Sequence, residues 1–119
     1  MYLAINGAEI AKYPSEFKVT VMDLDNAEST ARTADGTLTR DRIAVKRQIE
    51  MGFNAMRWED LSAIQQAVSD KFFEFTYPDP VTGQQEMKVF YAGDRQSAVA
   101  IERDGTYWWT GLQMTLTEK

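Results

Sequence analysis

Apolar and polar residues alternate along several segments of this chain, a pattern typical of half-buried β-strands. Residues 17–23 alternate in this way, and residues 43–53 do so over the longest stretch. In the longer stretch, Arg47 falls on the same face as the large apolar side chains. Near the N-terminus, Asn6-Gly7 lies between two short apolar segments and is a strong signal for a two-residue hairpin. The first half of the chain is therefore predicted to consist mostly of strands.

The last third of the chain shows further strand patterns, separated by turn residues. Strands are predicted within residues 72–77, 86–91, 98–102 and 107–117. Asp104-Gly105 is a second two-residue hairpin signal between the last two of them. Tight turns of this kind join neighbouring strands that run in opposite directions, so antiparallel pairing is expected.

One segment has helical spacing, and we predict a single α-helix over about 55–69. The apolar residues that recur at intervals of three or four are Trp58, Leu61, Ile64 and Val68. Asn54 is a suitable residue to cap the N-terminus of this helix. Glu59 and Asp60 follow in its first turns, where the helix dipole favours negative charge.

Together these patterns predict a mainly β (α+β) protein that forms a single domain over residues 1–119. One helix is too few for a repeating β-α-β arrangement with a parallel sheet. We therefore expect an antiparallel β-sandwich or a partly closed barrel, with the helix at one end or over one face.

Two tryptophans in the last predicted strand fall on opposite faces of it. Alternation places Trp108 on the same face as Leu112 and Met114, so we expect Trp108 in the core. Trp109 then points outward, and tryptophan is enriched among the residues that anchor interfaces. We interpret Trp109 as an interface residue; a second small core under the helix and a ligand platform are the alternatives.

Residues 25–37 contain no large aliphatic side chain and bury little apolar surface. We predict a long projecting hairpin over about 25–42, with Asp35-Gly36 at its tip. The basic residues in this region are Arg32, Arg40, Arg42, Lys46 and Arg47. This cluster favours contact with an acidic protein surface. A solvated strand face and contact with DNA are the alternatives, although no aromatic residue interleaves with the basic ones.

The composition narrows the chemistry that the chain can perform. It has no cysteine and no histidine, which excludes disulfides and the nucleophile systems that depend on either residue. Its net charge of -5 disfavours nonspecific binding to nucleic acid. No phosphate-binding or dinucleotide-binding motif is present, so we expect no enzymatic activity, cofactor or metal. The enzymatic alternative is a carboxylate-dependent hydrolase that uses Glu59, Asp79 or Asp94. The sequence contains no run of 18 apolar residues, so no membrane span is predicted.

Four blocks of sequence resemble a known family, in the same order and over nearly the whole chain. They are residues 17–36, 40–47, 75–95 and 109–119. The family consists of small prophage proteins from Gram-positive bacteria and their long-tailed phages, usually encoded among the tail genes. More loosely, the order of short strands, a long polar hairpin, a long strand, a helix and strand pairs is similar to tail tube and distal tail proteins. In those proteins a β-sandwich flanked by one helix assembles into hexameric rings.

The resemblance implies a structural subunit of a phage or prophage tail, of the tail tube, distal tail or tail-tip type. It implies a ring-type homo-oligomer, a hexamer, formed through the projecting hairpin, with other tail proteins such as the tape measure as partners. DNA would pass through the ring lumen without specific binding. The protein would be synthesised and assembled in the bacterial cytoplasm and located in the virion. The residues expected at the assembly interface are Arg32, Asp35, Gly36, Arg40, Arg42, Lys46 and Trp109. A head–tail connector, a tail-completion protein or another phage protein-binding module are the alternatives.

Overall fold

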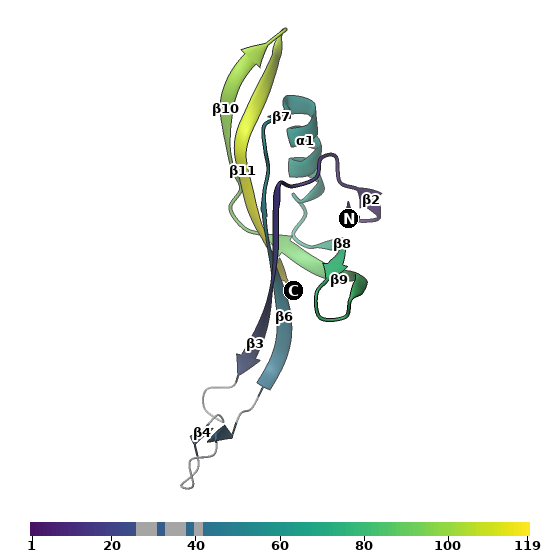
Figure 1. Ribbon diagram of the computed structural model, residues 1–119, viewed down its shortest axis with the longest axis vertical. Coiled ribbons are helices and arrows are strands. Elements are labelled where there is room, and N and C mark those ends of the chain that lie inside the picture. The colour runs from purple at the N-terminus through teal and green to yellow at the C-terminus, as the bar shows by residue number, and fades with distance from the viewer. Residues whose placement is uncertain (26–30, 33–37, 40–41) are drawn as a thin grey trace.

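The computed structural model describes residues 1–25, 31–32, 38–39 and 42–119 and is mainly β (Figure 1). The strands are β1 (Ala4–Ile5), β2 (Ala8–Glu9), β3 (Glu16–Asp25), β4 (Ala31–Arg32), β5 (Leu38–Thr39), β6 (Arg42–Gly52), β7 (Met56–Arg57), β8 (Phe73–Asp79), β9 (Gln84–Ala92), β10 (Gln96–Arg103) and β11 (Thr106–Glu118). The described part has a single helix, α1 (Trp58–Ala67). The predicted mainly β class, with one helix, is confirmed.

Nine of the strands form one antiparallel sheet in which β11 is the central element. The order is β2-β1-β8-β9-β11-β6-β3, and β10 and β7 pair with the first half of β11. One edge of β11 therefore contacts β6 and then β7, and the other edge contacts β9 and then β10. Antiparallel pairing is confirmed, and the described sheet does not close into a barrel.

Two strand pairs extend from the body of the molecule in opposite directions (Figure 1). The pair β3–β6 runs from Glu16↔Gly52 to Asp25↔Arg42, with one register shift between Leu24 and Asp25. The pair β10–β11 runs from Gln96↔Gln113 to Arg103↔Thr106, with register shifts between Gln96 and Ala98 and between Val99 and Ile101. The tip between β10 and β11 is the predicted Asp104-Gly105 turn, where both residues have positive φ, 53° and 77°. Beyond β3 and β6, the short strands β4 and β5 pair with each other. The rest of the predicted hairpin over 25–42, including its tip at Asp35-Gly36, lies outside the described residues.

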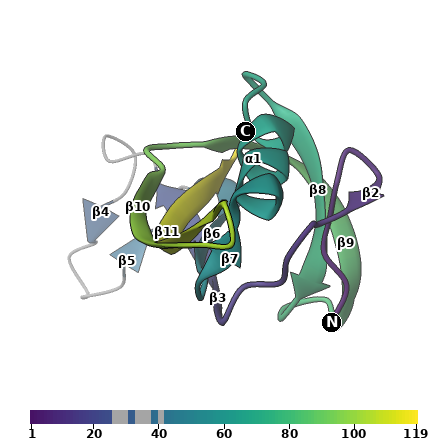
Figure 2. The same cartoon turned by 90° about the horizontal axis from the view of Figure 1, so that it is seen from above.

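The helix begins at Trp58, three residues after the predicted start, and its N-cap is Arg57, which makes no side-chain capping bond. Residues Met56 and Arg57 instead form β7, which pairs with Trp109 and Trp108 of β11. The backbone hydrogen bonds of that pairing compete with the first helical turn, and a sequence pattern does not show them. Seen from above, the sheet curls around α1 (Figure 2).

A single apolar core lies between α1 and the inner face of the curled sheet. The helix contributes Leu61 and Ile64, followed by Val68 just after its end, as its spacing predicted. Trp58 was predicted on the same face, but it is 51% exposed and is not part of the core. The remaining core residues come from the strands and their connections: Leu3, Ile5, Ile10, Ile49, Met51, Phe53, Met56, Phe73, Phe75, Tyr77, Phe90, Leu112, Met114 and Leu116.

The prediction for the two tryptophans of β11 is wrong about Trp108, and Gly111 supplies the reason. Leu112 is buried, as alternation predicted. The tryptophan of β11 that packs against the core, however, is Trp109, three residues before Leu112, and not Trp108. Gly111 has φ of 68°, a left-handed conformation that glycine adopts without strain, and the β10–β11 register shifts beside it. Because of this irregularity, the residues of β11 before Gly111 face the side opposite to the one that alternation predicts. Trp108 consequently lies outside the core, beside the Arg57 guanidinium at 5.7 Å from its ring.

Candidate interaction surfaces

The basic surface predicted on and near residues 25–42 is only partly described. Lys46 lies on β6, and its Nζ donates to the backbone carbonyl of Lys119 at the end of the chain. Arg32 lies on β4 and Arg42 on β6, where their backbones pair with Leu38 and Asp25. The side chains of Arg32 and Arg42, and the whole of Asp35, Gly36 and Arg40, lie outside the described residues. The predicted contact of this surface with an acidic partner therefore stays a prediction.

Arg47 is buried on the apolar face of β6, where alternation placed it, and it contacts Asp79 at the end of β8. Arg47 Nε lies 3.2 Å from Asp79 Oδ2, but it makes no hydrogen bond in a good geometry, so the contact is an ion pair. Asp79 also accepts hydrogen bonds from the Tyr77 hydroxyl, at 3.0 Å, and from the Val81 N–H, at 2.8 Å. This network joins β6 to the β8–β9 hairpin across the core.

The network determines the protonation of the Asp79 carboxyl group and the Tyr77 hydroxyl. Burial of Asp79 acts to raise the pKa of its carboxyl group, but the hydrogen bonds from Val81 and Tyr77 and the positive charge of Arg47 outweigh it and hold the pKa below its ordinary value. Burial, followed by the hydrogen bond to Asp79, raises the pKa of the Tyr77 hydroxyl. Asp79 is therefore ionised and Tyr77 neutral around pH 7. From the sequence, Asp79 was considered only as one of three carboxylates for a hydrolase. The sequence signal for the ion pair was the charged Arg47 on an apolar face, because a buried charge requires a partner.

Because of Asp79, the protein is expected to lose stability in acid. A carboxyl group whose pKa is lower in the folded state stabilises that state fully above the ordinary pKa of about 4, and the stabilisation is lost as the pH falls through the folded-state value. Urea unfolding at pH 7, 5, 4 and 3 measures this dependence. The variant Asp79→Asn cannot titrate at this position and should show a shallower decline. Equal slopes in the two proteins would contradict the prediction.

The three carboxylates that a hydrolase would need do not converge. Asp79 belongs to the buried ion pair, Glu59 lies exposed at the start of α1, and Asp94 lines a hollow on the outer side of the sheet with Glu16 and Lys18. Across residues 1–25, 31–32, 38–39 and 42–119, no cluster of three acidic residues is placed to hold a metal ion. Within the same residues, no helix is long and apolar enough to cross a membrane.

Trp109, which was predicted as an outward interface residue, lies half-buried against the core instead. Its ring is 6.4 Å from that of Trp58, and Trp58 meets Tyr107 edge to face at 5.5 Å. The Trp109 indole nitrogen is buried and donates to no described group. Trp109 packs against the same core as Leu112 and Met114, so it belongs to no second core, and its interface role stays a prediction. Trp58, at 51% exposure, is the most exposed of the three tryptophans, because Trp108 and Trp109 are both partly buried.

Strand β10 is exposed to solvent along its whole length. All eight of its residues are exposed, including Val99 at 51% and Ile101 at 54%. In Figure 1, β10 lies on the side of β11 that is away from β7 and α1, in keeping with the exposure of its residues. The sequence Ala98–Ile101 gave no sign of this exposure, because a short apolar run normally indicates a buried strand.

Comparison with known proteins places the chain in a family. The model of DUF6711, described as a family of unknown function, matches residues 4–119. The chain belongs to DUF6711. No curated protein matches it, and no solved structure does. The match spans β1 through the C-terminus, so the buried ion pair and both extended strand pairs lie within the DUF6711 region.

Proposed function

We propose that this DUF6711 protein is a structural subunit of a phage or prophage tail, which assembles with copies of itself and with other tail proteins. The observation that carries the proposal is the architecture of the sheet, which ends in the long edge strands β3 and β10 on two extended pairs. Unpaired strand edges present rows of backbone donors and acceptors to other chains. Assembly covers such edges by strand addition.

The shape of the molecule supports a role in assembly. The Cα radius of gyration is 18.3 Å, whereas a compact domain of this length has about 13–14 Å. An elongated subunit exposes more surface for contacts with neighbours than a compact one does. The four sequence blocks of the chain resemble prophage proteins encoded among tail genes. We therefore propose that the protein belongs to the phage tail and is located in the virion.

We also infer a sandwich-like body from which the segment over about 25–42 projects. Arg47 on β6 contacts Asp79 on β8, and Phe17 and Val19 of β3 pack against the same core as β8 and β9. Two parts of the open sheet therefore face each other across the core. The basic residues of the projecting segment are the proposed contact with an acidic surface of a neighbouring subunit, in a ring of six as the resemblance implies.

The proposal is tested by asking whether the protein is part of the virion. Particles purified from an induced lysogen that carries the gene are separated by density and analysed by mass spectrometry. We expect the chain in intact tails at several copies for each particle. A chain that is abundant in the lysate but missing from purified tails would count against the proposal, and a stoichiometric complex with a non-tail partner would favour another protein-binding role.

Deleting residues 31–37 is expected to leave the body folded and to abolish assembly. The reason is that this segment carries no large apolar residue, so it contributes little to the core. The matched control replaces the same seven residues with glycine and serine, which keeps the length of the connection. Thermal melting measures folding and light scattering at high concentration measures assembly. An unfolded deletion variant alongside a folded control would show that the connection length matters, and unfolding of both would contradict the prediction.

A further inference from the structure

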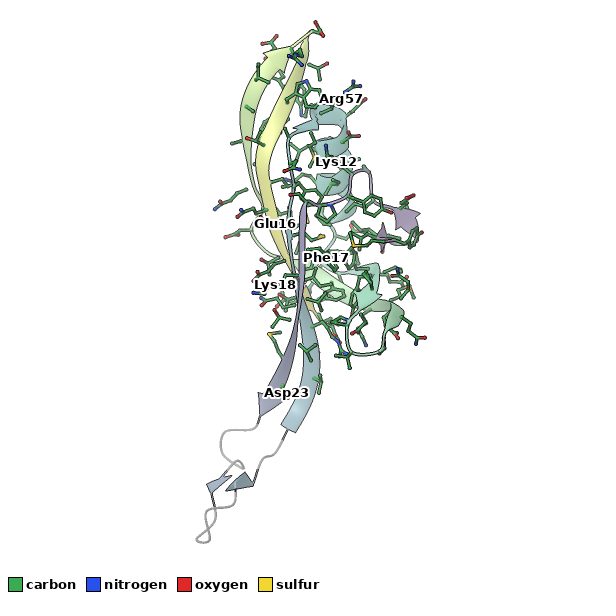
Figure 3. All side chains as sticks on the ribbon, viewed as in Figure 1. Lys12, Glu16, Phe17, Lys18, Asp23 and Arg57 are labelled. Carbon is green, nitrogen blue, oxygen red and sulfur yellow. The ribbon has the colours of Figure 1, made fainter. Side chains whose placement is uncertain are left out.

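We infer that an open hollow beside Trp58 binds the ring of a neutral sugar. The hollow lies between the first turn of α1 and the turn that joins β10 to β11, and Figure 3 labels Arg57 at this end of the helix. Its volume of about 440 Å³ is within the range of about 300–1,000 Å³ that is usual for small-ligand sites. The inference goes beyond the proposed function and does not depend on it. The residues that line the hollow are Arg57, Trp58, Glu59, Ser62, Gly105 and Thr106.

The Trp58 indole is the flat, apolar wall of the hollow. About half of this residue is exposed to solvent. The ring meets Tyr107 edge to face, with centroids 5.5 Å apart, and lies 6.4 Å from the ring of Trp109. These two neighbours support the indole at the edge of the core and favour one orientation of it. An aromatic ring that is supported in this way loses little side-chain freedom when a ligand stacks on its exposed part.

The polar side chains around the hollow supply both donors and acceptors of hydrogen bonds. Arg57 Nη1 and Glu59 Oε1 lie 3.8 Å apart, which is too far for a hydrogen bond, and both side chains are more than half exposed. The guanidinium and the carboxylate can therefore bind a ligand as well as each other. The Arg57 guanidinium also lies 5.7 Å from the ring of Trp108, which restricts its position. Ser62 Oγ accepts a hydrogen bond from Gln66 Nε2 at 2.9 Å, and its own proton can be donated to a ligand.

One aromatic wall and a polar rim of both charges favour a neutral sugar over other ligands. A pyranose ring presents a face of C–H groups, which packs on an indole, and a rim of hydroxyl groups, which both donate and accept. An anionic ligand such as a nucleotide would meet the Glu59 carboxylate, and a cation such as choline would meet the Arg57 guanidinium. A protein side chain that anchors an interface fills a well-packed, desolvated pocket. Among the six lining residues, Trp58 is the one large apolar side chain, so the hollow does not fit such an anchor.

Saturation-transfer NMR of the whole chain with small ligands tests the class of ligand. The neutral probes are cellotetraose, maltotetraose and chitotetraose, and the charged comparisons are adenosine monophosphate and choline. We expect at least one of the three sugars to bind, with the strongest saturation at the C–H protons of one ring face, because that face lies on the indole. Both charged probes are expected to bind more weakly than this sugar. The inference is overturned if none of the three sugars binds, or if either charged probe binds more tightly than all of them.

Titration of variants with the sugar that binds best locates the site. Trp58→Ala should weaken binding at least about tenfold, whereas Trp58→Phe, which keeps an aromatic ring, should stay within about threefold of the unchanged protein. Glu59→Ala removes an acceptor at an exposed position, so its expected loss of about threefold or more does not come from unfolding. The matched control is Tyr91→Ala, an exposed aromatic residue of β9 outside the hollow, which should bind as the unchanged protein does.

Thermal melting verifies that each variant is folded at the temperature of the titration. Binding that survives both Trp58→Ala and Glu59→Ala, or that falls as much in Tyr91→Ala as in Trp58→Ala, would place the sugar elsewhere and overturn the inference. Neither result affects the proposed function, which depends on the presence of the chain in purified tails. Absence from tails, with binding at Trp58 intact, overturns the proposed function alone.

Discussion

Replacing Asp79 with alanine is expected to lower the free energy of unfolding by about 3–5 kcal/mol. The side chain of Asp79 is fully buried, and it is the one charged partner described for the buried Arg47 guanidinium. Alanine would leave Arg47 charged inside the core, because the guanidinium does not lose its proton. It would also leave the Tyr77 hydroxyl and the Val81 N–H without the acceptor that they now use.

Chemical denaturation of purified protein at pH 7 measures this loss, and a double-mutant cycle identifies its cause. Arg47→Met removes the buried charge and keeps most of the side-chain volume, so Arg47→Met combined with Asp79→Ala should be less destabilised than the sum of the two single variants. The matched control is Glu74→Ala, an exposed position on β8, the strand that carries Asp79. It should change the free energy of unfolding by about 0.5 kcal/mol or less. Additive effects in the cycle would show that the two side chains act independently.

The ion pair also illustrates how far sequence reasoning reached. Alternation along residues 43–53 placed Ile49, Met51 and Arg47 on one face, and all three are buried. The partner of Arg47 lies 32 positions later in the chain, beside a proline-rich turn in which aspartate has an ordinary local role. A pattern of neighbouring residues carries no information about such a contact, because the folding of β8 against β6 creates it.

Local irregularities account for the other differences. The alternation rule assumes a regular strand, and one glycine with positive φ before Leu112 was enough to exchange the faces of Trp108 and Trp109. Helical spacing identified Leu61 and Ile64 correctly, but pairing of Met56 and Arg57 with β11 moved the helix start and left Trp58 at its exposed end. The exposure of β10 follows from the extension of a hairpin beyond the body, which depends on the length of β11 relative to its neighbours.

Because Trp58 is exposed, a buried aromatic residue of the sheet, and not the helix tryptophan, is expected to contribute more to stability. Phe90 on β9 is fully buried and meets Phe75 and Tyr77 edge to face, with ring centroids 5.8 Å and 5.7 Å apart. Replacing it with alanine removes both contacts and leaves a cavity at the centre of the core. We expect Phe90→Ala to lower the free energy of unfolding by about 3–5 kcal/mol.

Trp58 provides the comparison that makes this prediction specific. Helical spacing alone would make it the main anchor of α1 and assign the larger loss to it, but half of its surface is in solvent and its contacts are with Tyr107 and Trp109 at the edge of the core. Because much of the side chain is already hydrated, Trp58→Ala should cost about 1–2 kcal/mol, less than half the loss at Phe90. Tyr91→Ala, which changes the exposed neighbour of Phe90 on the same strand, controls for strand propensity. Urea denaturation of the three variants ranks them, and a loss at Trp58 equal to that at Phe90 would mean that α1 is held mainly by its first residue and not by Leu61 and Ile64.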